Sequence, residues 1–229
     1  MKTIKQLSLV LALSGTLFAA NASAATVIDT AAGWNGSTYV QNWGSGGEGT
    51  EVYGQSVTAP VGSSVLTGFS FNIRDTIVPI SYNAFVYAWD GAKITGPALF
   101  SLGGQSVGGG GTSNFLPVSF STSVGVNPGD RYMLFLSTIG VDQKPAQGTV
   151  WGFRDADVYS GGGFFFYNTQ DFGRLSTTPW ETFDGVLDTA FTASFDGTGT
   201  TVVPVPGALG LMLSGVAALG FLGRRRRKA

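Results

Sequence analysis

Hydrophobic and polar residues alternate over much of the middle of the chain. In the stretch VLTGFSFNI, residues 65–73, the odd positions are mostly large and the even ones mostly small or polar. Because successive side chains of a strand point to opposite faces, this pattern predicts a strand with one buried face. The same reasoning predicts further strands over residues 50–58, 82–89, 115–120, 131–139, 149–153, 163–167 and 189–196.

Turn-forming residues separate these predicted strands. They occur as Pro60 to Gly62, Asp90-Gly91, Asn127 to Asp130 and Asp196-Gly197, and such clusters typically connect antiparallel strands. No convincing amphipathic helix occurs before the C-terminal tail. Residues 25–202 are therefore predicted to form an all-β domain, an antiparallel β-sandwich or jelly roll. The glycine-rich stretches 44–49 and 103–111 are predicted to be loops.

The N-terminus has the three parts of a secretory signal peptide. Lys2 and Lys5 precede an apolar run over residues 7–18, and Ala-Ser-Ala follows at 22–24. Twelve residues reach only about 18 Å as a helix, whereas the apolar core of a bilayer is roughly 30 Å thick. We therefore expect residues 1–24 to direct export and to be cleaved from the mature chain.

The C-terminus carries the most hydrophobic stretch of the chain. Residues 207–223 contain no charged side chain and would form about 25 Å of helix, just enough to span a membrane. Basic residues stay on the cytoplasmic side of a membrane. The sequence therefore predicts a transmembrane helix with residues 224–229 inside the cell and the β domain outside.

This tail resembles the PEP-CTERM sorting signal of Gram-negative bacteria. Val203-Pro204-x-Pro206 precedes the apolar stretch, and Val205 stands between the prolines where the name-giving Glu of the family occurs. The resemblance covers residues 203–229. It implies a protein held in the inner membrane until an exosortase-type enzyme removes the tail, with release to the cell surface or an exopolysaccharide matrix. The sorting residues that it implies are Val203, Pro204, Pro206, Arg224, Arg225, Arg226 and Arg227.

A second resemblance covers more of the chain. Residues 84–100, 128–138, 150–168 and 188–195 are similar to secreted bacterial β-sandwich domains found upstream of such tails. This resemblance implies a fold and a location, and it assigns no functional residue.

Composition excludes several kinds of chemistry. The chain has no Cys and no His, which rules out Ser-His-Asp triads, Cys nucleophiles, disulfides and His or Cys zinc sites. Residues 25–203 hold six basic and fourteen acidic residues, a net charge of -8, which disfavours nucleic acid as a partner. We therefore expect a non-catalytic protein. The alternative is a secreted polysaccharide-active enzyme that uses a carboxylate pair.

Aromatic residues suggest contact with carbohydrate. Aromatics make up 13% of the chain, and a flat ring is able to stack on the apolar face of a sugar while nearby polar groups bind its hydroxyls. Trp34, Trp43 and Trp180 lie beside Gly, Asn or Pro and are predicted to be exposed ligand-binding residues. The alternative for each is burial in the core, which aromatic side chains commonly dominate.

Asp155 and Asp157 are the candidate metal ligands. In an extended chain both carboxylates point to one side, and loop carboxylates with carbonyls are the ligands that calcium prefers. These residues therefore predict a site for one structural calcium ion. The alternative is a solvated acidic loop, because no Asp-x-Asp-x-Asp-Gly sequence is present.

Overall fold

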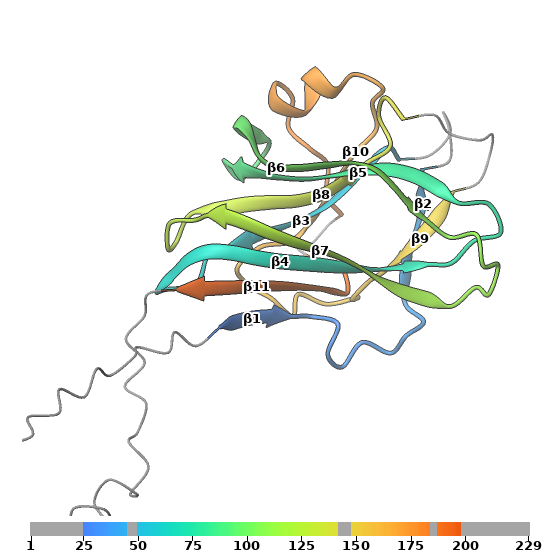
Figure 1. The fold of residues 1–229 in the computed structure, drawn as a ribbon, viewed down its shortest axis with the longest axis horizontal. Helices are drawn as coiled ribbons and strands as arrows, with labels where there is room; N and C mark the ends of the chain where they lie inside the picture. Colours follow the sequence, from blue (N-terminus) through green and yellow to red (C-terminus); the bar gives the residue numbers. More distant parts are fainter. Residues whose placement is uncertain (1–24, 45–49, 142–147, 184–186, 198–229) are drawn as a thin grey trace, which may run out of the picture. The chain divides into compact units, whose positions relative to one another are not determined.

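The computed structural model describes residues 25–44, 50–141, 148–183 and 187–197, all within the compact unit Ser23–Gly199. Strands form two antiparallel sheets (Figure 1). The strands are β1 (Thr26–Asp29), β2 (Tyr39–Trp43), β3 (Val52–Thr58), β4 (Ser63–Arg74), β5 (Ile80–Trp89), β6 (Ile94–Val107), β7 (Phe115–Gly125), β8 (Arg131–Ser137), β9 (Thr149–Gly152), β10 (Phe164–Tyr167) and β11 (Phe191–Gly197). A 3-10 helix, η1 (Phe172–Ser176), follows β10.

The strand order defines which strands lie at the sheet edges. The six-stranded sheet runs β1-β11-β4-β9-β2, with β7 also paired to β4, and the five-stranded sheet runs β10-β3-β8-β5-β6. Every ladder between these named strands is antiparallel. Strand β2 therefore ends one sheet, and β10 is the last strand of the other.

The two sheets share one hydrophobic core. On β8, Leu134 and Leu136 belong to the cluster that includes Phe71 and Phe191 of the opposite sheet. Their neighbours Met133 and Phe135 belong to a second cluster on the other face of β8. Because side chains alternate along a strand, one face of the five-stranded sheet packs against the six-stranded sheet. The prediction of an all-β sandwich is confirmed.

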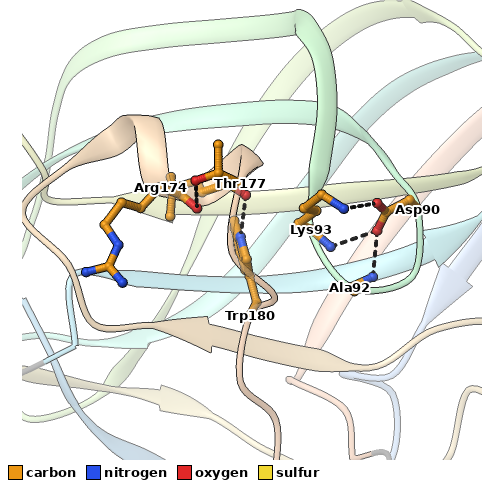
Figure 2. Close-up of polar contacts among 7 residues, drawn as sticks. Asp90, Ala92, Lys93, Arg174, Thr177 and Trp180 are labelled. Atoms are coloured by element: carbon orange, nitrogen blue, oxygen red, sulfur yellow. Dashed lines mark hydrogen bonds and ion pairs between the residues drawn. The ribbon is translucent and has the colours of Figure 1, made fainter.

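The outer face of the five-stranded sheet is also covered. The segment containing η1 lies over it, shown in orange in Figure 1, and supplies Leu175 and Trp180 to the second cluster. Figure 2 shows the turn that lies next to this segment. In this turn Asp90 accepts hydrogen bonds from the backbone N–H groups of Ala92 and Lys93 and from the Lys93 ammonium group. The Trp180 backbone N–H then donates to the Ala92 carbonyl at 2.8 Å.

The alternation pattern located most of the strands. Strands β3, β4, β5, β7, β8, β9, β10 and β11 overlap the predicted segments, and β1, β2 and β6 were not predicted. The prediction that residues 103–111 form a loop is wrong in its first half, because Gly103–Val107 completes β6. Only residues 108–111 form the loop, and most of the other predicted loop, 45–49, lies outside the described residues.

A buried carboxylate organises the loop at residues 108–111. Asp75 accepts hydrogen bonds from the backbone N–H groups of Gly110 and Thr112 and from the Thr112 hydroxyl, at 3.0, 2.8 and 2.8 Å. A Cβ at Gly110 would lie 2.6 Å from the Asp75 carboxylate, and one at Gly108 would lie 2.3 Å from the Thr76 hydroxyl. These glycines are needed because the loop packs closely on residues 75–76.

The predictions for the two ends of the chain fall outside the described residues. These are the signal peptide at 1–24 and the sorting tail at 203–229, with its membrane span at 207–223. In the described part of the chain, no helix has the length and apolar character needed to cross a membrane.

Two of the buried tryptophans, Trp43 and Trp180, give the first testable prediction. Replacing Trp43 or Trp180 by Ala in the fragment 23–199 should lower the free energy of unfolding by about 3 to 5 kcal/mol, because each change leaves a large cavity. The matched control is Leu102→Ala at an exposed position of β6, which should change it by no more than about 0.5 kcal/mol. Urea unfolding followed by circular dichroism measures both, and an unaffected Trp180→Ala variant would contradict this packing.

Asp75 gives a pH-dependent prediction. Hydrogen bonds from Thr112, first its backbone N–H and then its hydroxyl, hold the pKa of Asp75 below its ordinary value of 3.8. A carboxylate with a lowered pKa stabilises the fold above its unfolded pKa, and this contribution is lost as pH falls through the lowered pKa. Asp75→Asn should therefore lower the melting temperature at neutral pH, and the difference from wild type should shrink below about pH 4.

The control for this experiment is Asp155→Asn, at an exposed position. Thermal unfolding of the same fragment at a series of pH values should show no comparable pH-dependent difference for this variant. A gap between Asp75→Asn and wild type that stayed constant down to about pH 2 would contradict the proposed role of the charged carboxylate.

Candidate functional site

An aromatic groove lies where the edges of the two sheets meet. The groove has a volume of about 390 Å³. Strands β2 and β10 and the segments that follow β9 and β10 supply residues to its lining. The lining residues are Tyr39, Val40, Gln41, Asn42, Thr50, Tyr53, Phe153, Phe166 and Phe183.

An irregularity in β2 shapes one wall of the groove. The pairing of β2 with β9 shifts between Val40 and Trp43, and Asn42 has a positive φ of 71°. Such a bulge leaves residues unpaired and redirects their side chains. Gln41 and Asn42 are consequently exposed, at the mouth of the groove.

Backbone contacts fix this bulge. The Thr50 N–H donates to the Asn42 carbonyl at 2.7 Å, and the Gly44 N–H donates back to the Thr50 carbonyl at 2.9 Å. The Tyr53 hydroxyl donates to the Gln41 carbonyl. The five-stranded sheet therefore holds the edge of the six-stranded sheet through Tyr53, and the groove wall is a fixed part of the fold.

The other wall is a set of packed phenylalanine rings. Phe183 lies 5.7 Å from Phe164, 5.3 Å from Phe166 and 5.9 Å from Phe153, measured between ring centroids. Phe164 is buried in the core, yet Phe183 keeps 41% of its surface exposed. Core residues thus fix the position of the exposed Phe183 ring. This fixed position lowers the conformational entropy that is lost when a ligand binds.

The groove is polar but uncharged. None of its lining residues, all of which lie in the described part of the chain, is an acid or a base. Burial raises the pKa of Tyr53 to about 12, so this phenol is neutral at physiological pH. Amide and hydroxyl groups beside exposed rings suit a ligand with apolar faces and many hydroxyl groups.

The structure corrects two of the three tryptophan predictions. Trp43 is fully buried between the sheets and Trp180 is only 5% exposed on the outer face of the five-stranded sheet, so the prediction that they are exposed is wrong. Trp43 packs against Trp151 at 5.2 Å, and Trp180 packs against Trp89 at 5.4 Å. The Gly and Pro residues beside these tryptophans do occur at or next to turns, but the tryptophan side chains point into the protein.

Trp34 is half-buried and lies apart from the groove lining. Its indole N–H donates to the Thr38 carbonyl at 3.0 Å, its ring meets Phe115 edge-on at 4.8 Å, and it lies over Gly152, where a Cβ would come within 2.8 Å. The structure therefore does not bring the three tryptophans together, and a binding role for Trp34 stays a prediction.

The acidic pair Asp155 and Asp157 is exposed. No group of three or more His, Cys, Asp or Glu residues suited to a metal ion occurs in the described ranges, so the calcium site stays a prediction. The nearby buried carboxylate, Asp188, has protein donors instead: Gln55 at 2.8 Å, and the N–H groups of Val158 and Tyr159 at 2.9 Å. Burial raises the pKa of Asp188, and the charge of Asp157 adds to this effect.

Sequence reasoning missed the residues that line the groove. Tyr39, Gln41 and Asn42 lie on an unpredicted strand, and Phe183 follows a predicted strand without belonging to it. The stretch YVQN, 39–42, which combines one aromatic residue with two amides, was the available signal. Nothing in the sequence indicates that this strand lies beside β10.

Comparison of the chain with family models, with curated proteins and with solved structures finds no match.

Proposed function

We propose that this chain is an exported, non-catalytic module of the bacterial cell surface or extracellular matrix that contacts carbohydrate through the groove. The observation that carries this proposal is the pairing of two exposed rings, Tyr39 at 43% and Phe183 at 41%, with the exposed amides of Gln41 and Asn42. Sugars present both a C–H face that stacks on such rings and hydroxyls that bond to such amides, as small-ligand sites combine apolar walls with few polar groups.

The roles of the buried acids support binding rather than catalysis. Glycosidases need two carboxylates that flank the scissile bond, and the described lining of the groove contains none. Asp75 and Asp188 accept backbone hydrogen bonds at loops. Glu51 accepts hydrogen bonds from the backbone N–H of Thr169 and the side-chain amide of Gln170. These contacts give the carboxylates structural roles, so the polysaccharide-active enzyme is the less favoured alternative.

The ends of the chain support the cellular location in this proposal. The signal peptide at 1–24 would deliver the domain across the inner membrane, and the helix at 207–223 would hold it there with the arginines inside. Removal of the tail by an exosortase-type enzyme, as the PEP-CTERM resemblance implies, would then release residues 25–202 toward the surface or the exopolysaccharide.

The groove gives a direct binding prediction. The full chain, exported from a Gram-negative host and kept in a non-ionic detergent, should be retarded in native gels that contain a suitable polysaccharide. Tyr39→Ala and Phe183→Ala should each weaken this affinity about tenfold, equivalent to about 1.4 kcal/mol, because each removes a stacking surface. The melting temperature should fall only slightly, since both rings are partly exposed.

The matched control is Leu102→Ala, whose side chain is 40% exposed on β6, at the opposite edge of the five-stranded sheet from β10. This variant should migrate as the wild type does. Absence of retardation on every gel of a broad polysaccharide panel, or release of reducing sugar from any of them, would refute the binding proposal.

The tail gives a prediction about topology. A tag inserted after residue 199, beyond β11, should be protected from protease in intact cells and digested once the outer membrane is opened. A tag after residue 229 should be protected in both cases, because the basic cluster keeps that end in the cytoplasm. Mature protein released to the medium should end near Pro206 and lack the arginines.

The arginines themselves test the retention step. Replacing Arg224, Arg225, Arg226 and Arg227 by Ser should increase the amount of uncleaved chain in the periplasm, as measured by cell fractionation and mass spectrometry of the C-terminal peptide. Full-length protein with its arginine-rich end in the extracellular fraction, or a cytosolic chain with residues 1–24 intact, would overturn the proposed sorting.

A further inference from the structure

An arginine lies beside the aromatic groove. Arg74 is the last residue of β4, and its guanidinium carbon lies 5.4 Å from the centroid of the Tyr39 ring. Tyr39 is also a lining residue of the groove, so one residue contacts the cation and borders the ligand space. A guanidinium over an aromatic face is attracted by the electron density of the ring, which holds this charge near the mouth of the groove.

Contacts of the main chain fix the backbone position of Arg74. The Thr149 hydroxyl of β9 donates to the Arg74 carbonyl at 2.8 Å, and Arg74 pairs with Phe115 in the ladder between β4 and β7. The side chain is partly buried. Arg74 is therefore anchored at the end of a central strand, in contrast to an arginine on a free surface loop.

The guanidinium of Arg74 has no acceptor among the described residues. The ion pair found in that part of the chain joins Lys93 to Asp90, and Arg154 differs from Arg74 because its guanidinium donates to the carbonyls of Thr30 and Ala32 at 3.1 Å. A guanidinium has five N–H donors in a fixed fork. Within the described ranges, those of Arg74 have no protein acceptor.

This unpaired cation is unexpected in so acidic a domain. Residues 25–203 carry six basic and fourteen acidic residues, yet none of the acids that the structure describes forms an ion pair with Arg74. The acids that are buried, Asp75, Asp188 and Glu51, accept hydrogen bonds from other groups. The net charge of -8 repels a polyanion at long range, but the groove itself is a neutral surface with one positive charge at its side. This local charge is complementary to an anionic group bound beside it.

We propose that the groove takes an acidic polysaccharide, in which the carboxylate of a uronic acid unit accepts a forked pair of hydrogen bonds from Arg74 while a sugar ring stacks on Tyr39. The forked geometry of a guanidinium matches the two oxygens of a carboxylate. This inference rests on the proposed function, because it assigns the class of sugar that the same groove selects.

The experiment compares two polymers that differ only in charge. The probes are polygalacturonate and its fully methyl-esterified form, and the full chain in detergent is run in native gels that contain either one. The wild type should bind polygalacturonate about tenfold more tightly than the ester, as expected for one charged contact of about 1.4 kcal/mol. Arg74→Gln should bind both polymers equally.

Two further variants distinguish the forked hydrogen bonds of Arg74 from a general effect of positive charge. Arg174→Gln removes the same charge from an exposed position in η1 and should retain the preference for polygalacturonate. Arg74→Lys keeps the positive charge but lacks the forked donors, and it should show an intermediate preference. It also keeps the proposal testable if the Gln variant does not fold. Circular dichroism checks that each variant is folded.

The outcomes distinguish this inference from the proposal beneath it. If the chain binds both polymers equally, or if Arg74→Gln keeps the preference, the uronate site is refuted while carbohydrate binding stands. If Arg174→Gln loses the preference as fully as Arg74→Gln, or if dextran sulfate is bound as tightly as polygalacturonate, the attraction is a general one to polyanions and the site is refuted. If no polysaccharide on the panel is bound, both proposals fail.

Discussion

The packing of aromatic rings around Trp151 is the constraint on which the sandwich and its groove depend. Trp151 on β9 lies 4.6 Å from Phe71 and 5.2 Å from Trp43 within its own sheet, and 5.5 Å from Tyr53 of the facing sheet. Tyr53 in turn meets Phe164 at 5.1 Å. Without disulfides, which a chain lacking Cys cannot form, such contacts must hold the two sheets in register.

The same ring contacts connect the core to the surface. Phe164 is buried, and Phe183 stacks on it with its outer side exposed, while Tyr53 ties the β2 bulge to the facing sheet through the Gln41 carbonyl. The groove is therefore shaped by the side chains that stabilise the fold. A site built on rigid elements keeps its geometry in the absence of ligand, and this preorganisation favours binding.

The sequence predicted those strands in which buried and exposed positions alternate regularly. Strands β4 and β5 each bury one face against the facing sheet, so their hydrophobic residues recur with a period of two. Strand β6 is almost wholly exposed and rich in Gly, and thus carries no such period. Trp43 and Trp180 were misplaced because their burial depends on distant residues, Trp151 and Trp89, that local sequence does not identify.

The acidic surplus of the domain also acquires a physical explanation. Asp75 and Asp188 accept backbone N–H groups across loops. A carboxylate bonded in this way is stabilised by amide dipoles and needs no basic partner, so acids accumulate at the turns of a strand-rich chain without matching bases. The charge of the domain therefore reflects how its turns are built. Among the described residues these acids leave Arg74 without an ion pair, and this charge is the one that the proposed uronate contact uses.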